Sequence, residues 1–239
     1  MRLLKSKKLK YAYVSVAGLL GSGKTTASNL LAEQLGFHLF EEKVNENKFL
    51  PLFYAEPKRW AFHSQLFYLR EKSSQLVKIK NIINETNVIQ DSPIHQDYLT
   101  YAKAQQKLGH MNEDEFALYE KMFNVLNRDV PTPNLIIQLN ASVPTIMERI
   151  KKRARSYEKS IDPSYVELLS ELQNEWLSNN PKINIISINT DDLNIATNPK
   201  HQEEFIEKVK KHLGNMAEEP RLRLPFFSNK KTTSLNSSS

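Results

Sequence analysis

The chain has 239 residues, of which 40% are hydrophobic, and this length provides for one substantial α/β core rather than two independent domains. It contains no cysteine, which excludes a disulfide framework and any cysteine-ligated zinc or iron–sulfur site and agrees with a reducing compartment. Because no apolar run approaches the about 20 residues that span a bilayer, we expect a cytoplasmic protein with no membrane partner. The formal net charge is +6, but basic and acidic residues are interspersed, so we expect a solvated surface and no nucleic-acid partner.

The first predicted element is a strand at residues 11–17, an apolar and β-branched run that ends at a glycine. The basic residues before it superficially resemble the start of a secretory signal, but the apolar stretch is short and leads directly into a glycine loop. Residues 26–35 follow with apolar positions at helical spacing. This part of the chain therefore predicts a strand, a loop and a helix, in that order.

Residues 87–90, 135–139 and 183–188 repeat the strand pattern, with long stretches of helical periodicity between them. Strands that are almost continuously apolar and alternate with helices predict a five-stranded parallel sheet with helices on both faces. Ligands bind such sheets at the carboxyl ends of the strands. The polar residues expected there are Gly18 and those after it, Glu41, Glu42 and Asp91.

The regular pattern fails from about residue 216, where prolines and a run of Ser, Asn, Lys and Thr leave little to bury. We therefore predict one domain over residues 1–215 and a disordered tail over residues 216–239.

Residues 18–25 read GLLGSGKT and match in full the phosphate-binding pattern G-x-x-x-x-G-K-[ST], between a predicted strand and a predicted helix. The glycines let successive backbone N–H groups and the helix N-terminus face an anion. We expect Lys24 to reach the β- and γ-phosphates of ATP and the Thr25 hydroxyl to bind Mg²⁺. The predicted phosphate-binding residues are Gly18, Leu19, Leu20, Gly21, Ser22, Gly23, Lys24, Thr25 and Thr26.

The phosphate loop does not identify the acceptor, because many unrelated proteins share it. Four later stretches are more specific, namely FEEKVNEN at 40–47, FYAEPKRWAF at 53–62 leading to Gln65, DSP at 91–93 and RIKKRARSYE at 149–158. With the loop, they resemble the deoxynucleoside kinases over about residues 11–213, particularly the bacterial deoxyadenosine and deoxyguanosine kinases. The resemblance implies a P-loop kinase fold, ATP-dependent 5′-phosphorylation of a deoxynucleoside in nucleotide salvage, and a homodimer.

The resemblance also implies roles for individual residues around the acceptor. Glu42 matches the family's general base, which accepts the proton of the 5′-hydroxyl, because a hydroxyl is a poor nucleophile until that proton has an acceptor. Gln65 matches a glutamine that reads a base edge, and Tyr101 matches an aromatic residue that stacks on the base. Tyr54 and Glu158 match the pair that bonds the sugar 3′-hydroxyl.

Lys72 and Asp97 match an Arg and an Asp that face the base in purine- and cytosine-using members of the family. Lysine lacks the planar bidentate geometry of arginine, so the implied preference for a purine or cytosine over thymine is weak. Arg149, Arg153 and Arg155 match the family's lid, in which arginines neutralise charge on the transferring phosphoryl group. The resemblance implies that all three bind ATP and that Arg153 is catalytic.

The match is broken at Asp91-Ser92-Pro93, where the family pattern is an acid followed by Arg and Ser. That arginine sits beside the general base, so its loss bears on catalytic rate. Lys43 and Arg153 are the candidates for a cation that replaces this arginine beside the general base. Because Ser92→Arg would restore the cation, it is expected to raise kcat. Pro93 predicts an extended backbone at Ser92. Asp91 remains suited to hold Mg²⁺ directly or through water.

Two other functions remain open at this stage. A nucleoside monophosphate kinase of the thymidylate type shares the fold, but a phosphate-bearing acceptor favours a cation where Ser92 stands. A catalytically weak nucleotide-binding subunit or regulator is favoured by Ser92 and Lys43, which both depart from the family pattern.

Overall fold

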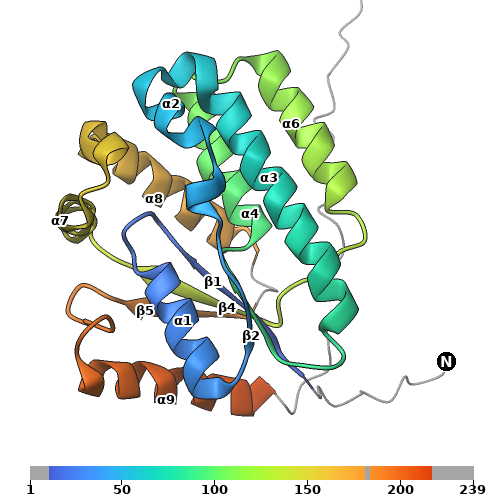
Figure 1. Ribbon diagram of the computed structural model, residues 1–239, viewed down its shortest axis with the longest axis vertical. Helices are drawn as coiled ribbons and strands as arrows, with labels where there is room; N and C mark the ends of the chain where they lie inside the picture. Colours follow the sequence, from blue (N-terminus) through green and yellow to red (C-terminus); the bar gives the residue numbers. More distant parts are fainter. Residues whose placement is uncertain (1–10, 181–183, 217–239) are drawn as a thin grey trace, which may run out of the picture.

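The computed structural model describes residues 11–180 and 184–216, and they form a sheet covered by helices on both faces (Figure 1). The strands form one parallel sheet in the order β2-β3-β1-β4-β5, which confirms the predicted five-stranded parallel sheet. The strands are β1 (Tyr13–Gly18), β2 (His38–Phe40), β3 (Val88–Asp91), β4 (Leu135–Asn140) and β5 (Ile185–Asn189).

Two helices cover one face of the sheet, namely α1 (Lys24–Leu35) and α9 (Pro199–Met216). The other face is covered by a larger group of helices, whose long member α3 runs beside α6 (Figure 1). The remaining elements are η1 (Val44–Glu46), α2 (Phe49–Ala55), α3 (Pro57–Ile82), α4 (Ile94–Gln96), η2 (Asp97–Ala102), α5 (Lys103–Lys107), α6 (Glu113–Leu126), α7 (Val143–Arg153), η3 (Ser156–Ser160) and α8 (Pro163–Ser178).

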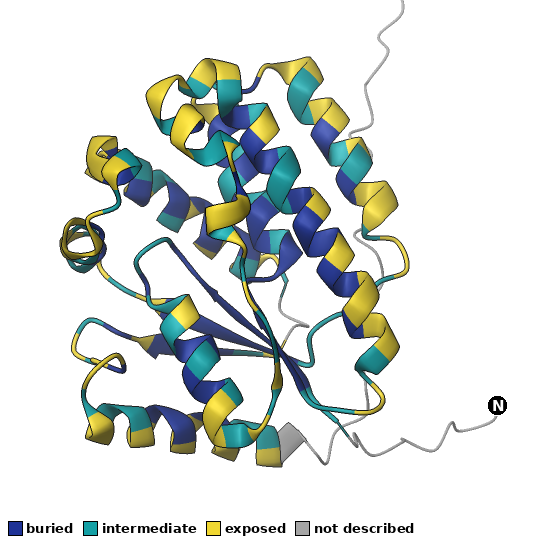
Figure 2. Ribbon diagram, in the orientation of Figure 1, coloured by how far each residue is buried: buried dark blue, intermediate teal, exposed yellow. Residues whose placement is uncertain are grey.

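Strand β1 shows why the central strands read as continuous apolar runs. All six of its residues are buried (Figure 2). Successive side chains of a strand point to opposite faces of the sheet. Val14 and Val16 pack in the core with α1 and α9, whereas Tyr13 packs in the core that contains α3 and α6. A strand covered on both faces cannot alternate between apolar and polar residues.

The boundaries differ from the predicted ones by one or two residues at most ends where both are described. Helix α1 begins at Lys24 rather than at residue 26, because Gly23 already closes the first helical hydrogen bond, from Ala27 N–H to its carbonyl. Apart from its first residue, the predicted disordered tail at 216–239 lies outside the described residues. Within residues 11–180 and 184–216, no helix combines the length and the apolar character that crossing a bilayer requires.

The strand order brings the ends of three strands together. β1 lies between β3 and β4, and β3 lies between β1 and β2. Because the strands are parallel, the loop after Gly18, the acidic residues after Phe40 and the end of β3 at Asp91 meet at one edge of the sheet.

Candidate active site

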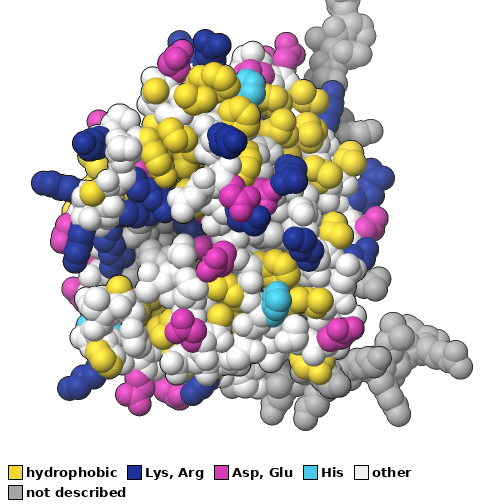
Figure 3. All heavy atoms as spheres, in the orientation of Figure 1, with side chains coloured by type: hydrophobic (Ala, Val, Ile, Leu, Met, Phe, Trp, Pro, Cys, Tyr) yellow, Lys and Arg dark blue, Asp and Glu magenta, His cyan; other side chains and the backbone are white. Residues whose placement is uncertain are grey.

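A cleft of about 720 Å³ lies at this edge of the sheet. Lys and Arg side chains gather on the surface where Figure 1 places α7, at one end of the cleft (Figure 3). Gly18, Leu19, Lys72 and Asp91 are not part of its lining. The predicted site residues that do line the cleft are Leu20, Gly21, Ser22, Gly23, Lys24, Thr25, Thr26, Glu42, Tyr54, Gln65, Asp97, Tyr101, Arg149, Arg153, Arg155 and Glu158.

The loop between β1 and α1 has a backbone that requires glycine. At Gly18, φ is +150°, and a Cβ atom would lie 2.4 Å from Ser22 Oγ and 2.8 Å from the Leu139 carbonyl oxygen. Gly23 precedes α1 with φ of 98° and has no side chain to cap the helix. The N–H groups of the first turn of α1 and the positive end of its dipole are therefore available to an anion.

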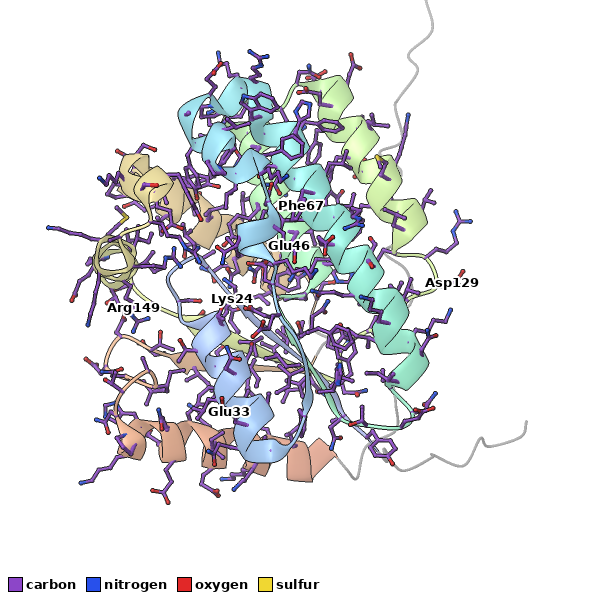
Figure 4. The ribbon with its side chains drawn as sticks, viewed as in Figure 1. Lys24, Glu33, Glu46, Phe67, Asp129 and Arg149 are labelled. Carbon is purple, nitrogen blue, oxygen red and sulfur yellow. The ribbon has the colours of Figure 1, made fainter. Side chains whose placement is uncertain are left out.

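The side chain of Lys24 lies over the same loop, where Nζ donates to the Leu19 carbonyl oxygen at 3.2 Å. Figure 4 shows Lys24 at the start of α1 and Arg149 on α7. A glycine-containing loop that leads into a helix N-terminus, with a lysine beside it, has the chemistry of a phosphate site.

Gln96 holds the start of this loop, a role that the sequence did not indicate. Its Oε1 accepts from the Gly18 N–H at 2.8 Å and its Nε2 donates to the Gly18 carbonyl at 2.9 Å. Gln96 is fully buried at the end of α4. An isolated glutamine in a short helix has no spacing or motif that would have marked it.

Thr25 and Asp91 together fit a divalent cation. Thr25 Oγ1 donates to Asp91 Oδ2 at 2.7 Å, while Asp91 Oδ1 is buried without a hydrogen-bond partner. Burial and the neighbouring Glu42 carboxylate raise the pKa of Asp91. A carboxylate oxygen without a donor, next to the hydroxyl of the phosphate loop, is the type of ligand that Mg²⁺ prefers.

Glu42 follows β2, and its side chain, 20% exposed, reaches the cleft. Its Oε1 accepts from Ser92 Oγ at 3.0 Å and lies 3.4 Å from Lys72 Nζ. Burial alone would raise the pKa of Glu42, but the ammonium groups of Lys72 and Lys24 and hydrogen bonds from Ser92 and Lys72 outweigh it and hold the pKa below its ordinary value. Glu42 is therefore ionised at neutral pH, as a proton acceptor must be.

The expectations about a cation returned by Lys43 or Arg153 are wrong. Lys43 points to the surface and forms an ion pair of 2.8 Å with Glu46, with both side chains about half exposed. Arg153 pairs instead with Glu158. The cation beside Glu42 comes from Lys72.

The backbone of Ser92 also differs from its prediction. Its φ is +59°, in the left-handed region, rather than extended as Pro93 favours. The Ser92 N–H donates to the Val16 carbonyl at 3.1 Å, and Ser92 Oγ contacts both Lys72 and Glu42. These tertiary hydrogen bonds stabilise a conformation that local preference disfavours.

Lys72 was expected to face the base beside Asp97, but its ammonium group contacts other residues. Its Nζ donates to Ser92 Oγ at 2.8 Å and to the Asp91 carbonyl, and no ion pair joins Lys72 to Asp97. Asp97 Oδ2 is buried without a hydrogen-bond partner. Burial, with only partial opposition from the charge of Lys72, raises the pKa of Asp97 to about 7.

The other residues expected at the nucleoside lie on neighbouring walls of the cleft. Gln65 Oε1 is buried and has no hydrogen-bond partner. Tyr101 Oη accepts from the Leu20 N–H at 3.0 Å, and Tyr54 stacks on Tyr157 with a ring-centre distance of 5.7 Å. Buried acceptors without donors at the wall of a cleft are suited to a ligand that brings donors.

The three arginines after β4 have two different surroundings. Arg149 donates to Thr190 Oγ1 at 3.0 Å and to the Gly21 and Ser22 carbonyls at 3.4 Å, so it joins α7 to the phosphate loop. Arg153 and Arg155 both contact Glu158, and Arg153 does so through two nitrogens at 2.7 and 3.0 Å.

A parallel sheet with a complete phosphate loop at its edge, an ionised carboxylate in the same cleft and a basic segment beyond it define a P-loop kinase. The family model for "Deoxynucleoside kinase" matches residues 14–214, and the chain belongs to this family.

Relatives with assigned activities are similar over most of their length. The deoxyadenosine kinase of Lactobacillus acidophilus is 32% identical over 209 residues, which cover 84% of this chain and 95% of the relative. The deoxyguanosine kinase of Bacillus subtilis is 29% identical over 202 residues, covering 83% and 96%. A solved structure of M. mycoides deoxyadenosine kinase with bound dATP has a TM-score of 0.71 and 26% identity, and covers 85% of this chain and 100% of that one.

These similarities confirm the family resemblance. The protein is a deoxynucleoside kinase, an enzyme that phosphorylates a nucleoside to its monophosphate. The family match also excludes the thymidylate-type alternative as the family of this chain.

Proposed function

We propose that the enzyme transfers the γ-phosphate of ATP to the 5′-hydroxyl of a deoxynucleoside, with a purine deoxynucleoside as the preferred acceptor. The observation that carries this proposal is the ionised Glu42 carboxylate in the same cleft as the phosphate loop. Glu42 accepts the proton of the 5′-hydroxyl, and the hydroxyl oxygen attacks the γ-phosphorus as the bond to ADP breaks.

The donor end of the cleft is assigned to ATP and Mg²⁺. The N–H groups after Gly18 and the Lys24 ammonium bind the phosphates, and Thr25 and Asp91 hold Mg²⁺. When bound, Mg²⁺ neutralises charge on the phosphate oxygens.

Arg149 and Arg153 are assigned to the lid. Arg149 already lies against the phosphate loop, whereas Arg153 is tied to Glu158. Arginines that approach the γ-phosphate stabilise the charge that spreads over its oxygens in the transition state.

The acceptor end of the cleft favours a base that carries an amino group. Gln65 Oε1 and Asp97 Oδ2 are both buried acceptors without donors. Adenine and cytosine carry an exocyclic amino group where thymine has a carbonyl oxygen, and guanine carries an amino group at another ring position, whereas thymine has none. The deoxyadenosine and deoxyguanosine kinases among the relatives support a purine as the preferred base. Tyr101 stacks on the base, and Tyr54 with Glu158 bonds the sugar 3′-hydroxyl.

We also propose that the enzyme is a homodimer. Four large apolar side chains are 40–65% exposed on the neighbouring helices α3 and α6, namely Val77, Leu118, Val125 and Leu126. Apolar side chains at this density on two packed helices favour a subunit contact.

A coupled assay of ADP formation tests the proposed reaction. The substrates are the four common deoxynucleosides and their monophosphates, each with ATP and Mg²⁺. We expect turnover with deoxyadenosine and deoxyguanosine, less with thymidine and none with the monophosphates. Lys24→Ala should lower kcat by orders of magnitude, because it removes the charge that reaches the transferring phosphate.

Exposed Lys78 on α3 supplies the matched control, since Lys78→Ala removes a charge of the same kind away from the cleft. Turnover confined to the monophosphates, or full turnover by Lys24→Ala, would contradict the proposal.

A further inference from the structure

We propose that Lys72 is a positioning residue for phosphoryl transfer, whose buried ammonium group, together with the bridging hydroxyl of Ser92, holds the Glu42 carboxylate oriented and ionised. This inference rests on the proposed function of Glu42 as the proton acceptor. It assigns Lys72 to the reacting end of the cleft rather than to recognition of the base.

The surroundings of the Lys72 ammonium group are complete. Its side chain is 1% exposed. The group has three N–H donors, and it meets three acceptors, which are the Asp91 carbonyl oxygen, Ser92 Oγ at 2.8 Å and Glu42 Oε1 at 3.4 Å. Ser92 Oγ in turn donates to Glu42 Oε1 at 3.0 Å. Lys72, Ser92 and Glu42 therefore form a closed triangle of polar contacts.

The triangle holds only one oxygen of the carboxylate. Both Lys72 and Ser92 contact Oε1 of Glu42, and among the described residues no hydrogen bond to Oε2 is present. Oε2 has no partner in the described part of the chain, and it is not completely buried. One oxygen is fixed and the other is left for the acceptor hydroxyl, which is the arrangement that a positioned base requires.

A role confined to stability does not account for this position. A buried ammonium group is costly unless it is paired, and a buried ion pair adds little to stability compared with apolar side chains of similar size. Here the charge is buried beneath a carboxylate that lines the cleft, while Lys72 itself does not line it. Ser92 is also fully buried and small enough to admit the lysine.

Several other charged or titratable groups face Glu42. Besides Lys72, Lys24 is the second cation that acts on Glu42. When ATP is bound, the Lys24 ammonium group pairs with the phosphates and stabilises the Glu42 carboxylate less. In the complex with ATP, Lys72 is then the cation in direct contact with Glu42 that favours the ionised carboxylate. The groups that act on Glu42 or lie beside it are Lys72 and Tyr68 on α3, Lys24 on α1, Asp91 and Ser92 at the end of β3, and Asp97 and Tyr101 on η2.

Lys72→Met tests the proposal, because methionine keeps a long apolar side chain and removes the charge. Lys78→Met is the matched control, on the same helix but exposed. With saturating ATP, kcat and KM for the deoxynucleoside are measured from about pH 4 to about pH 9, so that the range reaches the acidic limb of the wild type. We expect Lys72→Met to lower kcat by about 10-fold or more with a smaller change in KM, and to move the acidic limb of the kcat profile upward by about one pH unit.

Two further variants separate this proposal from the one on which it rests. Ser92→Ala removes only the bridge and should change kcat in the same direction by less. Glu42→Gln should lower kcat more than Lys72→Met does. If Glu42→Gln keeps the wild-type kcat, Glu42 is not the base and the proposed function fails. If Glu42→Gln is impaired but Lys72→Met keeps the wild-type kcat and acidic limb, the proposed role of Lys72 is wrong.

A titration of the folded protein gives a result that does not depend on turnover. The ¹³C signal of the Glu42 carboxyl group, identified by its loss in Glu42→Gln, is followed with pH in wild type and in Lys72→Met. We expect it to titrate at higher pH in Lys72→Met while Lys78→Met matches wild type. An unchanged titration in a folded Lys72→Met variant would overturn the proposal.

Discussion

At the scale of single residues, two adjacent glutamates illustrate how surroundings decide chemistry. Glu41 is exposed, and its carbonyl oxygen accepts from Gln75 Nε2 at 2.7 Å. Glu42 points into the cleft and contacts Lys72 and Ser92. Because the hydrogen bond from Gln75 anchors the backbone just after β2, the two side chains cannot exchange places.

Glu42→Gln should lower kcat by about 100-fold or more with a smaller change in nucleoside affinity, because glutamine keeps the shape but cannot accept the proton. Steady-state kinetics of this variant beside Glu41→Gln, which should be close to wild type, measure the difference. A larger loss in Glu41→Gln would mean that the base is assigned to the wrong residue.

Asp97→Asn should stabilise the ligand-free protein, and more so at about pH 8 than at about pH 5. Burial raises the pKa of Asp97 to about 7 from an ordinary value of 3.8. Between these values the folded state holds a proton that the unfolded chain has lost, so the contribution of Asp97 to stability falls as pH rises through this window. Asparagine is neutral throughout and avoids this loss. Thermal unfolding of Asp97→Asn at both pH values measures the effect, and Asp129→Asn, at an exposed position, is the control. An equal change in melting temperature at both pH values would contradict the raised pKa of Asp97.

Ser92→Arg should lower kcat and the melting temperature, contrary to the gain expected from the sequence. Ser92 is fully buried and Lys72 already occupies the position beside Glu42, so a second cation would meet like charge and too little space. A left-handed φ of +59° adds strain for a large side chain. Kinetics and thermal unfolding decide it, with Ser92→Ala as the uncharged control. A higher kcat would show that the site lacks a cation after all.

At the scale of elements, the phosphate loop depends on a helix that does not belong to it. Helix α4 has only three residues, yet its last residue, Gln96, bonds both backbone groups of Gly18. The loop is therefore held at its start by α4 and at its far side by Arg149 from α7. Contacts from separate elements hold a loop that has little side-chain packing of its own.

Gln96→Leu should weaken ATP binding and destabilise the protein by about 2 kcal/mol or more, because the buried N–H and C=O of Gly18 would lose their partners. The exposed α1 residue Gln34 provides the matched control, Gln34→Leu. Calorimetric titration with ATP and chemical denaturation measure the two effects. Unchanged ATP affinity in Gln96→Leu would mean that the loop holds its conformation without this support.

At the scale of the whole molecule, exposed apolar surface is concentrated on one pair of helices. Leu118 and Val125 lie two helical turns apart on α6, and Val77 is exposed on α3 beside it. None of Val77, Leu118, Val125 and Leu126 lines the cleft. A subunit contact through α3 and α6 would therefore act on assembly and leave the cleft residues complete.

Val125→Glu should convert the proposed dimer into a monomer, because Val125 is 65% exposed and a charge buried in a subunit contact is strongly unfavourable. Sedimentation velocity measures the mass of the species in solution. Leu52 is an exposed residue of α2, and Leu52→Glu is the control that should not change the mass. A wild type that sediments as a monomer would contradict the dimer.

The sheet, the phosphate loop and many residues of the cleft wall could be predicted from the sequence. These features depend on contiguous patterns, such as the run of apolar residues in β1 or the glycine spacing from Gly18 to Gly23, and such patterns follow from local sterics and burial on both faces. Glu42 was predicted because it follows a predicted strand and matches the general base of the family that the chain resembles.

The side chains that support that wall are brought together by contacts between distant parts of the chain. Lys72 and Ser92 are 20 residues apart, and Gln96 and Gly18 are 78 apart. Nothing in their separate segments shows that they meet. The backbone of Ser92 was predicted to be extended, but it is left-handed. The reason is the same, because hydrogen bonds between Ser92 and three distant residues outweigh the local effect of Pro93. A buried charge has to find its partners across the fold, so the position of the cation beside Glu42 is a property of the packed molecule.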